Sequence, residues 1–230
     1  MKILASDFDN TIYYMDDEKK NKKNIEAIKS FIAYGNVFCI ITGRNYTSVK
    51  TLLTENDIPY SYLICDDGAI LFNNMDYCLQ TILLDEKDVD RVEELLKEMN
   101  CDYYLDDGYS ETEYRKGCVK VVVKCEDKEL ATKIVKYVKD NMDIHIYASR
   151  YHVNIINKNV NKKNALESLI EIEKLDKSLL RVIGDNDNDY EMLKEFDGAV
   201  MLKHHKKLDS LDKMQVDTLS DYIDYLMETK

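Results

Sequence analysis

Short apolar runs alternate with amphipathic segments along the first third of the chain and again along its last third. The runs at 2–8, 37–43 and 61–67 have the length of strands, and the segments 24–35 and 45–57 between them carry apolar residues at helical spacing. This order is typical of a parallel sheet with crossover helices. The alternation returns from about residue 161, with further elements expected at 162–174, 179–185, 189–196, 198–202 and 218–229. The sequence therefore predicts an α/β fold with a doubly wound, Rossmann-like parallel sheet.

The character of the sequence changes after residue 73. Helix-period segments at 89–99 and 128–142 stand beside strand-like runs at 101–105, 118–125 and 143–156. Neighbouring strands with short connections favour an antiparallel or mixed sheet that has its helices on one face. We therefore expect an α+β module, residues 79–158, inserted into an α/β core that consists of residues 1–78 plus 159–230.

The composition limits the kinds of partner. With 44 acidic against 32 basic residues the net charge is −12, and no basic block stands out, so nucleic acid is not an expected partner. No apolar run approaches the roughly 20 residues that cross a bilayer, and Asp7 and Asp9 interrupt the first run before a signal sequence could form. We expect a cytoplasmic protein, a monomer or weak homo-oligomer without a membrane partner, whose six cysteines are reduced thiols.

The stretch SDFDNT places two carboxylates directly at the end of a buried strand. Side chains alternate between the two faces of a strand, so Asp7 and Asp9 could project to the same side. Two carboxylates in that position repel each other unless a cation lies between them or one of them stays protonated. Asp9 could also be an ordinary turn residue. If a cation is the reason for the pair, other parts of the sequence must supply its remaining ligands.

Three further polar stretches follow predicted strands or begin predicted helices, where open α/β sheets bind ligands. Thr42 and Gly43 end the second strand at the start of a helix, which suits a phosphate group. Lys162 or Lys163 begins a helix, and the acidic turn IGDNDND follows another strand. Each stretch alone has an ordinary explanation: a loop, a solvated lysine, or a helix N-cap at Asp189. All four together, each at the end of an element, favour a site.

In this order the four stretches resemble the four motifs of the haloacid dehalogenase-like (HAD) hydrolases. The matches are D-x-D-x-T at 7–11, T-G-R at 42–44, K-x-x-A-L at 162–166 and G-D-x-x-N-D-x-x-M-L at 184–193. The resemblance covers the whole chain, because the insertion is similar to the cap of the Cof-type branch, subclass IIB. It therefore implies a HAD-like core with a C2-type cap.

Three residues depart from the usual motifs. Lys163 occupies a position that is usually glycine, so Lys162 is the match and Lys163 its rival. Asn10 replaces a common glycine, which is a mild change because asparagine tolerates left-handed backbone angles. Asp67 stands where the family often has asparagine, so its role stays open.

The resemblance implies a phosphatase that works through an aspartyl-phosphate. Asp7 would be the nucleophile and Asp9 the general acid and base. Asp7, Asp185 and the backbone carbonyl of Asp9 would hold Mg²⁺. Asp189 would orient Lys162 or cap a helix. The phosphoryl group would be bound by Thr11, Thr42, Gly43, Lys162 and Asn188.

The substrate class implied is a small phosphorylated metabolite, such as a sugar phosphate. Arg44, Arg115, Arg150 and His152 are candidates for contacting it, although each has a plain surface explanation. A phosphosugar mutase of the same superfamily is an alternative function. A regulatory domain that carries phosphoaspartate without turnover is another, although such a domain has no need of an acid and base at Asp9.

Overall fold

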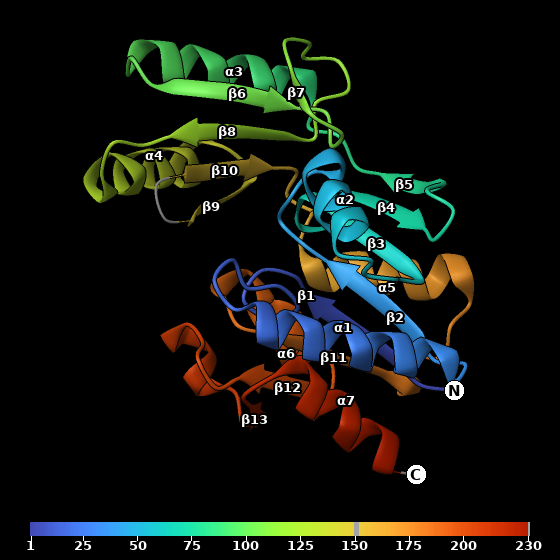
Figure 1. Ribbon diagram of the computed structural model, residues 1–230. Coiled ribbons are helices and arrows are strands. Elements are labelled where there is room, and N and C mark those ends of the chain that lie inside the picture. The colour runs from blue at the N-terminus through green and yellow to red at the C-terminus, as the bar shows by residue number, and fades with distance from the viewer. Residues whose placement is uncertain (150–151, 230) are drawn as a thin grey trace.

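The computed structural model describes residues 1–149 and 152–229 and contains two separate sheets. Figure 1 shows them one above the other, with the cap above the core. The order of the larger sheet is β13-β12-β11-β1-β2-β3-β4-β5. Its strands are β1 (Ile3–Asp7), β2 (Val37–Ile41), β3 (Tyr62–Cys65), β4 (Ile70–Asn73), β5 (Cys78–Thr81), β11 (Leu180–Gly184), β12 (Gly198–Met201) and β13 (Met214–Val216).

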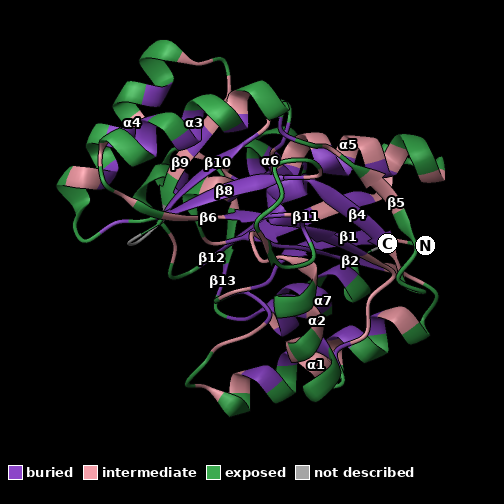
Figure 2. Ribbon diagram, turned by 90° about the horizontal axis from the view of Figure 1, so that it is seen from above, coloured by how far each residue is buried: buried purple, intermediate pink, exposed green. Residues whose placement is uncertain are grey.

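Helices cover both faces of the larger sheet, because its strands are apolar on both sides. Leu4 packs with residues of α1 (Glu18–Ala33), α2 (Tyr46–Glu55) and α7 (Leu219–Glu228). Its neighbours Ile3 and Ala5 face the opposite way, toward α5 (Lys162–Glu173) and α6 (Tyr190–Glu195). The same alternation continues in β2. Figure 2 shows the result, with buried strands between helices whose outer faces are exposed. The predicted α/β, doubly wound core is confirmed.

The core sheet is parallel except at one edge, and this antiparallel edge was not predicted from the sequence. β4 pairs antiparallel with β3, and β5 pairs antiparallel with β4. β5 belongs to the core sheet, so the change of sheet follows Thr81 rather than residue 78. The edge strand β13 was also missed, because its three residues are too few for a periodic pattern. With that shift, the division into a core and an inserted cap stays our proposal.

The smaller sheet is antiparallel, with the order β7-β6-β8-β10-β9. One face packs against the two cap helices in a separate apolar cluster. The elements are α3 (Glu86–Glu98), β6 (Asp102–Asp106), β7 (Glu111–Thr112), β8 (Lys120–Lys124), α4 (Lys128–Asn141), β9 (His145–Ser149) and β10 (His152–Ile156). The predicted α+β character of the inserted module is confirmed.

The described residues, 1–149 and 152–229, include no helix that is both long and apolar enough to cross a membrane.

Candidate active site

The predicted motif residues meet at the carboxyl ends of three adjacent strands. β1 lies between β11 and β2 and is parallel to both. Asp7 is the last residue of β1, Thr42 follows β2, and Asp185 follows β11. Parallel neighbours end at the same edge of a sheet, so three loops that are far apart in sequence converge there.

Three carboxylates form the centre of this edge. Asp7, Asp185 and Asp189 each place one oxygen within 4.8 Å of the others. Burial, together with Asp189 and Asp185, raises the pKa of Asp7 well above its usual range, although Lys162 opposes the shift. Burial and Asp189 likewise raise the pKa of Asp185 to about 6. Burial and the neighbouring carboxylates therefore disfavour the ionised form of Asp7 and Asp185.

The carboxylate cluster fits a divalent metal ion. Hard oxygen ligands suit Mg²⁺, and a dication would stabilise the ionised form of Asp7 and Asp185 against the burial and the neighbouring carboxylates that raise the pKa of both groups. The cluster contains Asp189 beside two of the predicted ligands, Asp7 and Asp185. The prediction for Asp9 concerned its backbone carbonyl and stays open.

Lys162, the first residue of α5, lies at the centre of the cluster. Its side chain is fully buried, and Nζ donates to Asp7 Oδ1 at 2.5 Å and to Asp189 Oδ1 at 2.6 Å. Burial opposes its charge, but Asp189 and Asp7 outweigh that effect and raise the pKa of Lys162. Lys163 instead pairs with Glu167 at 3.0 Å, with 30% of its side chain exposed. The geometry therefore favours Lys162 over Lys163 for a role in the site.

Asp189 holds two parts of the site together. Its Oδ1 accepts from Lys162, and its Oδ2 accepts from the backbone N–H groups of Asp185 and Asn186 at 2.9 Å each. Both oxygens are therefore engaged, which favours an orienting role for Asp189. Gly184 permits this arrangement, because a Cβ there would lie 2.4 Å from Cγ of Asp189.

Gly184→Ala is expected to destabilise the protein by about 2–4 kcal/mol, because the buried Asp189 side chain has no room to move. Gly35→Ala is the comparison, since Gly35 has a φ of +79° and no atom near the added carbon. That variant should lose only about 1 kcal/mol from backbone strain. Urea unfolding of both variants measures the difference. Equal losses of unfolding free energy in the two variants would mean that the Asp189 side chain can move to make room for the added carbon.

Of the predicted phosphate-binding residues, Lys162 and Thr11 contact the carboxylates, and the others lie in the loops at the same edge of the sheet. Thr11 is buried and donates through Oγ1 to Asp185 Oδ1 at 3.3 Å. Thr42 is buried, and its Oγ1 accepts from the backbone N–H of Arg44 at 3.1 Å. Asn188 donates through Nδ2 to Asp67 Oδ1 at 2.8 Å. A Cβ on Gly43 would approach the same Asp67 carboxylate to 3.1 Å. Their role in binding phosphate stays a prediction.

Asp9 is paired with Arg44. The guanidinium donates to both carboxylate oxygens, through Nε at 2.9 Å and Nη2 at 2.7 Å. Such bidentate pairs fix the geometry of both side chains. Arg44, expected as a contact for substrate, therefore also holds the predicted general acid and base.

Four residues near the site were not assigned a role from the sequence: Asp66, Asp67, Lys120 and Tyr147. Lys120 is buried in a cap strand, where it pairs with Asp66 and donates to the Gly43 carbonyl at 2.8 Å. Tyr147 donates to Asp67. A lysine in the apolar run CVKVVVKC was the one available signal, because a buried charge needs a partner. The sequence did not identify that partner.

The remaining cap candidates lie elsewhere or are not described. Arg115 pairs with Asp90 and Glu93 of α3, inside the cap. His152 is exposed and lies opposite Lys124 in the cap sheet, whereas Lys120, at the other end of β8, contacts the core. Arg150 lies outside the described residues. The cap residues described at the site are therefore different from those expected.

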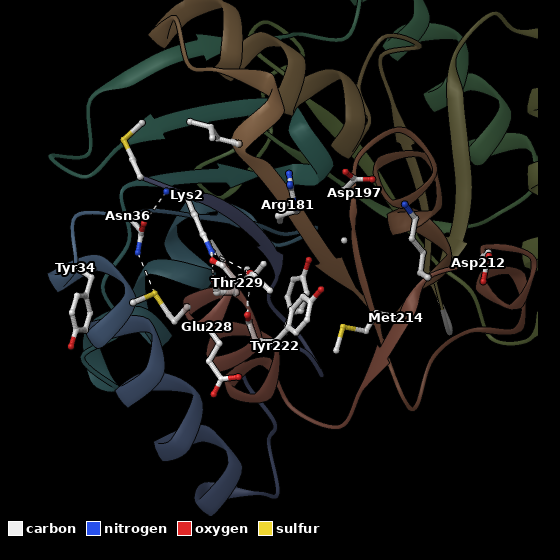
Figure 3. Close-up of a pocket in the computed structure, with 17 residues that line it drawn as sticks. Lys2, Tyr34, Asn36, Arg181, Asp197, Asp212, Met214, Tyr222, Glu228 and Thr229 are labelled. Atoms are coloured by element: carbon white, nitrogen blue, oxygen red, sulfur yellow. Dashed lines mark hydrogen bonds between the residues drawn. The ribbon is translucent and has the colours of Figure 1, made fainter.

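A cavity of about 1070 Å³ lies at the opposite edge of the core sheet (Figure 3). Its lining includes Lys2 and Arg181, near the starts of β1 and β11, and none of the described residues predicted for the site. The Lys2 ammonium donates to the carbonyl oxygens of Leu226 and Thr229. A cation at the end of a helix satisfies its free carbonyl groups, so Lys2 has a structural role there.

Comparisons with known proteins agree with the geometry. The model of the haloacid dehalogenase-like hydrolase family matches residues 4–111 and 104–218. A Haemophilus influenzae protein named "Putative phosphatase" is 22% identical over 84% of this chain and 81% of its own length.

Solved structures share the whole fold. A phosphatase of the HAD superfamily from Bacteroides thetaiotaomicron has a TM-score of 0.83 at 20% identity, covering 99% of this chain and 94% of its own. A HAD subclass IIB sugar phosphatase has a TM-score of 0.82 at 13% identity, covering 99% of both chains. The family model spans both the core and the cap, so this chain belongs to the haloacid dehalogenase-like hydrolases and has the fold of their subclass IIB members.

Proposed function

We propose that the protein is a Mg²⁺-dependent phosphatase that hydrolyses a small phosphorylated metabolite, such as a sugar phosphate, through an aspartyl-phosphate. The observation that carries the proposal is the buried Asp7 carboxylate at a strand end, hydrogen-bonded to buried Lys162 and next to Asp185. The names of the similar proteins, a phosphatase and a sugar phosphatase, support the same reaction.

Asp7 is the nucleophile in this proposal. One of its oxygens bonds to phosphorus while the bond from phosphorus to the leaving oxygen breaks, and Asp9 gives that oxygen a proton. Asp9 then takes a proton from water, which attacks phosphorus and releases inorganic phosphate from Asp7. The pair with Arg44 keeps Asp9 oriented between the two steps.

The neighbouring residues bind the phosphoryl group. Lys162 supplies a fixed positive charge, and the remaining donors are Thr11, Thr42, the Gly43 backbone and Asn188. Mg²⁺, held by Asp7, Asp185 and the Asp9 carbonyl, would neutralise phosphate charge that would otherwise repel Asp7. The cap, attached at 82–85 and 157–161, would cover the site and recognise the leaving group.

The proposal is tested by measuring phosphate release from a panel of phosphorylated metabolites with Mg²⁺ present. We expect turnover of several small phosphate esters, with sugar phosphates among the best. Isomerisation of a phosphosugar without release would indicate a mutase. A stable phosphoprotein without turnover would indicate a regulatory domain. Either result would replace the proposed function.

Removal of the metal is expected to stop phosphate release reversibly. EDTA should abolish activity, and added Mg²⁺ should restore it, because Asp7 cannot approach a phosphate against the charge of the cluster. Asp185→Asn should raise the Mg²⁺ concentration needed for half-maximal activity by about tenfold or more, since one charged ligand is lost. Magnesium titrations of both proteins measure the change. Full activity in excess EDTA would contradict the metal assignment.

A further inference from the structure

The turn after β3 is where the cap meets the candidate site. Asp66 and Asp67 are both buried and both adopt left-handed φ angles, +50° and +58°. Such backbone conformations cost free energy and persist where the surroundings hold them. Each of these aspartates contacts one side chain of the cap: Lys120 pairs with Asp66, and Tyr147 donates a hydrogen bond to Asp67.

Tyr147 reaches the turn from the face of the cap sheet that carries no helix. Tyr147 lies in β9, directly opposite Asn154 of β10. The residues on either side of Asn154, Val153 and Ile155, face the cap helices, so Asn154 and Tyr147 face the other way. The Tyr147 hydroxyl donates to Asp67 Oδ2. Burial and the Asp67 charge raise the pKa of Tyr147 well above its usual range, so the hydroxyl keeps its proton and acts as the donor.

The other oxygen of Asp67 determines how the Asn188 amide is oriented. Asp67 Oδ1 accepts from Asn188 Nδ2 at 2.8 Å. An ionised carboxylate only accepts hydrogen bonds, so it selects the NH₂ end of the amide and excludes the carbonyl end. Nδ2 has two N–H groups, which leaves the second for a phosphoryl oxygen. The opposite orientation would turn the Asn188 carbonyl oxygen toward the phosphate and repel it.

We propose that Tyr147 is a positioning residue for Asn188: it holds the Asp67 carboxylate, which in turn presents the Asn188 N–H to the phosphoryl group. This inference rests on the proposed function for the identity of the ligand. It makes a cap residue part of the support for phosphate binding. Tyr147 and Asn188 donate to different oxygens of Asp67, so an asparagine at position 67 would place its NH₂ group against one of the two donors.

Neighbouring contacts keep the cap in the position that this arrangement needs. Lys120 donates to the Gly43 carbonyl at 2.8 Å, and Asn45 Nδ2 donates to Asp106 at 2.8 Å. The Tyr46 backbone N–H donates to the Gly108 carbonyl at 2.8 Å. All three join the cap to the loop after β2 and the start of α2. Tyr147 is therefore held in place by the cap sheet rather than by its own contact alone.

A double-mutant cycle tests the proposal. Tyr147→Phe removes only the hydroxyl and should lower kcat/KM by about fivefold to tenfold for a metabolite and for an aryl phosphate alike, because both share the phosphoryl group. In an Asn188→Ala background the same change should cost less than about twofold, since the residue it positions is gone. Equal losses in both backgrounds would overturn the proposal.

Tyr103→Phe is the matched control. Tyr103 is also a cap tyrosine whose hydroxyl donates to a carboxylate, Glu93 at 2.6 Å, but that carboxylate lies inside the cap. Its removal should leave kcat/KM unchanged. A loss equal to that of Tyr147→Phe would show a general effect of cap stability and would overturn the proposal.

The orientation of Asn188 can also be observed without turnover. The side-chain ¹⁵N–¹H₂ signals of Asn188, assigned by their absence in Asn188→Ala, should shift in Tyr147→Phe and stay in place in Tyr103→Phe. Unchanged signals in Tyr147→Phe would overturn the inference. If the wild-type protein releases no phosphate from any ester, the proposed function fails, and these signals still decide whether Tyr147 orients Asn188.

Discussion

Asp7→Asn is expected to lower phosphate release by at least about 10³-fold and to leave the protein folded. An amide is a poor nucleophile and a weak ligand for Mg²⁺, so the change removes both functions proposed for this side chain. The measurement is kcat in a continuous phosphate-release assay. Asp187→Asn is the control, because Asp187 is exposed and pairs with Lys207 at 2.7 Å. That variant should keep nearly full activity.

The stability of Asp7→Asn provides a second, independent test. The folded state raises the pKa of Asp7, so this group contributes stability at low pH that is lost as the pH rises through the raised pKa. At pH values above the ordinary pKa of an aspartate, and without metal, Asp7 therefore weakens the fold. The variant should be at least as stable as the wild type in EDTA, by thermal unfolding. Marked destabilisation, or retention of more than a small fraction of activity, would contradict the role given to Asp7.

Lys162→Ala is expected to lower kcat/KM by about 10²-fold or more, because it removes a charge-assisted contact from a desolvated site. It should also destabilise the protein by about 3–5 kcal/mol, since Asp189 is left as a buried, unpaired charge. Urea unfolding separates the loss of stability from the loss of activity. Lys162→Met, which keeps most of the volume, should share the kinetic defect.

Lys163→Ala is the matched control for Lys162. The Lys163 ammonium makes a surface pair within its own helix, so stability should change by no more than about 0.5 kcal/mol and kcat/KM should stay near the wild-type value. The opposite pattern, a silent Lys162→Ala and an inactive Lys163→Ala, would mean that the motif is shifted by one residue.

The alternation of strands and helices was sufficient to predict the core. Strands such as β1 and β2 are apolar on both faces, and segments with apolar residues at helical spacing separate them in the sequence. A doubly wound sheet is the arrangement that buries both faces of such strands. The strands β4, β5 and β13, at the two ends of the sheet order, were missed because they are short and their pairing depends on the sheet they join. Whether such a short segment forms a strand depends on its tertiary context.

The motif residues Asp7, Thr42, Lys162 and Asp185 could be predicted together for a related reason. Each lies at or just beyond the end of a strand or at the start of a helix, and the parallel order of the sheet brings those ends to one edge. Local pattern and topology are enough to place them within reach of one another. The choice between Lys162 and Lys163 needed the structure, because adjacent residues on a helix point about 100° apart and only one can face the carboxylates.

The sequence by itself thus determined the fold class, and it predicted the inserted cap and the set of residues at the sheet edge. Only the tertiary structure decided how that set is joined to the cap. Lys120 and Tyr147 lie 54 and 80 residues beyond the aspartates they contact, in a different sheet. No periodic pattern in the sequence encodes such a pair, because it forms only when two independently packed sheets come together and bury opposite charges and hydrogen-bonding groups against each other.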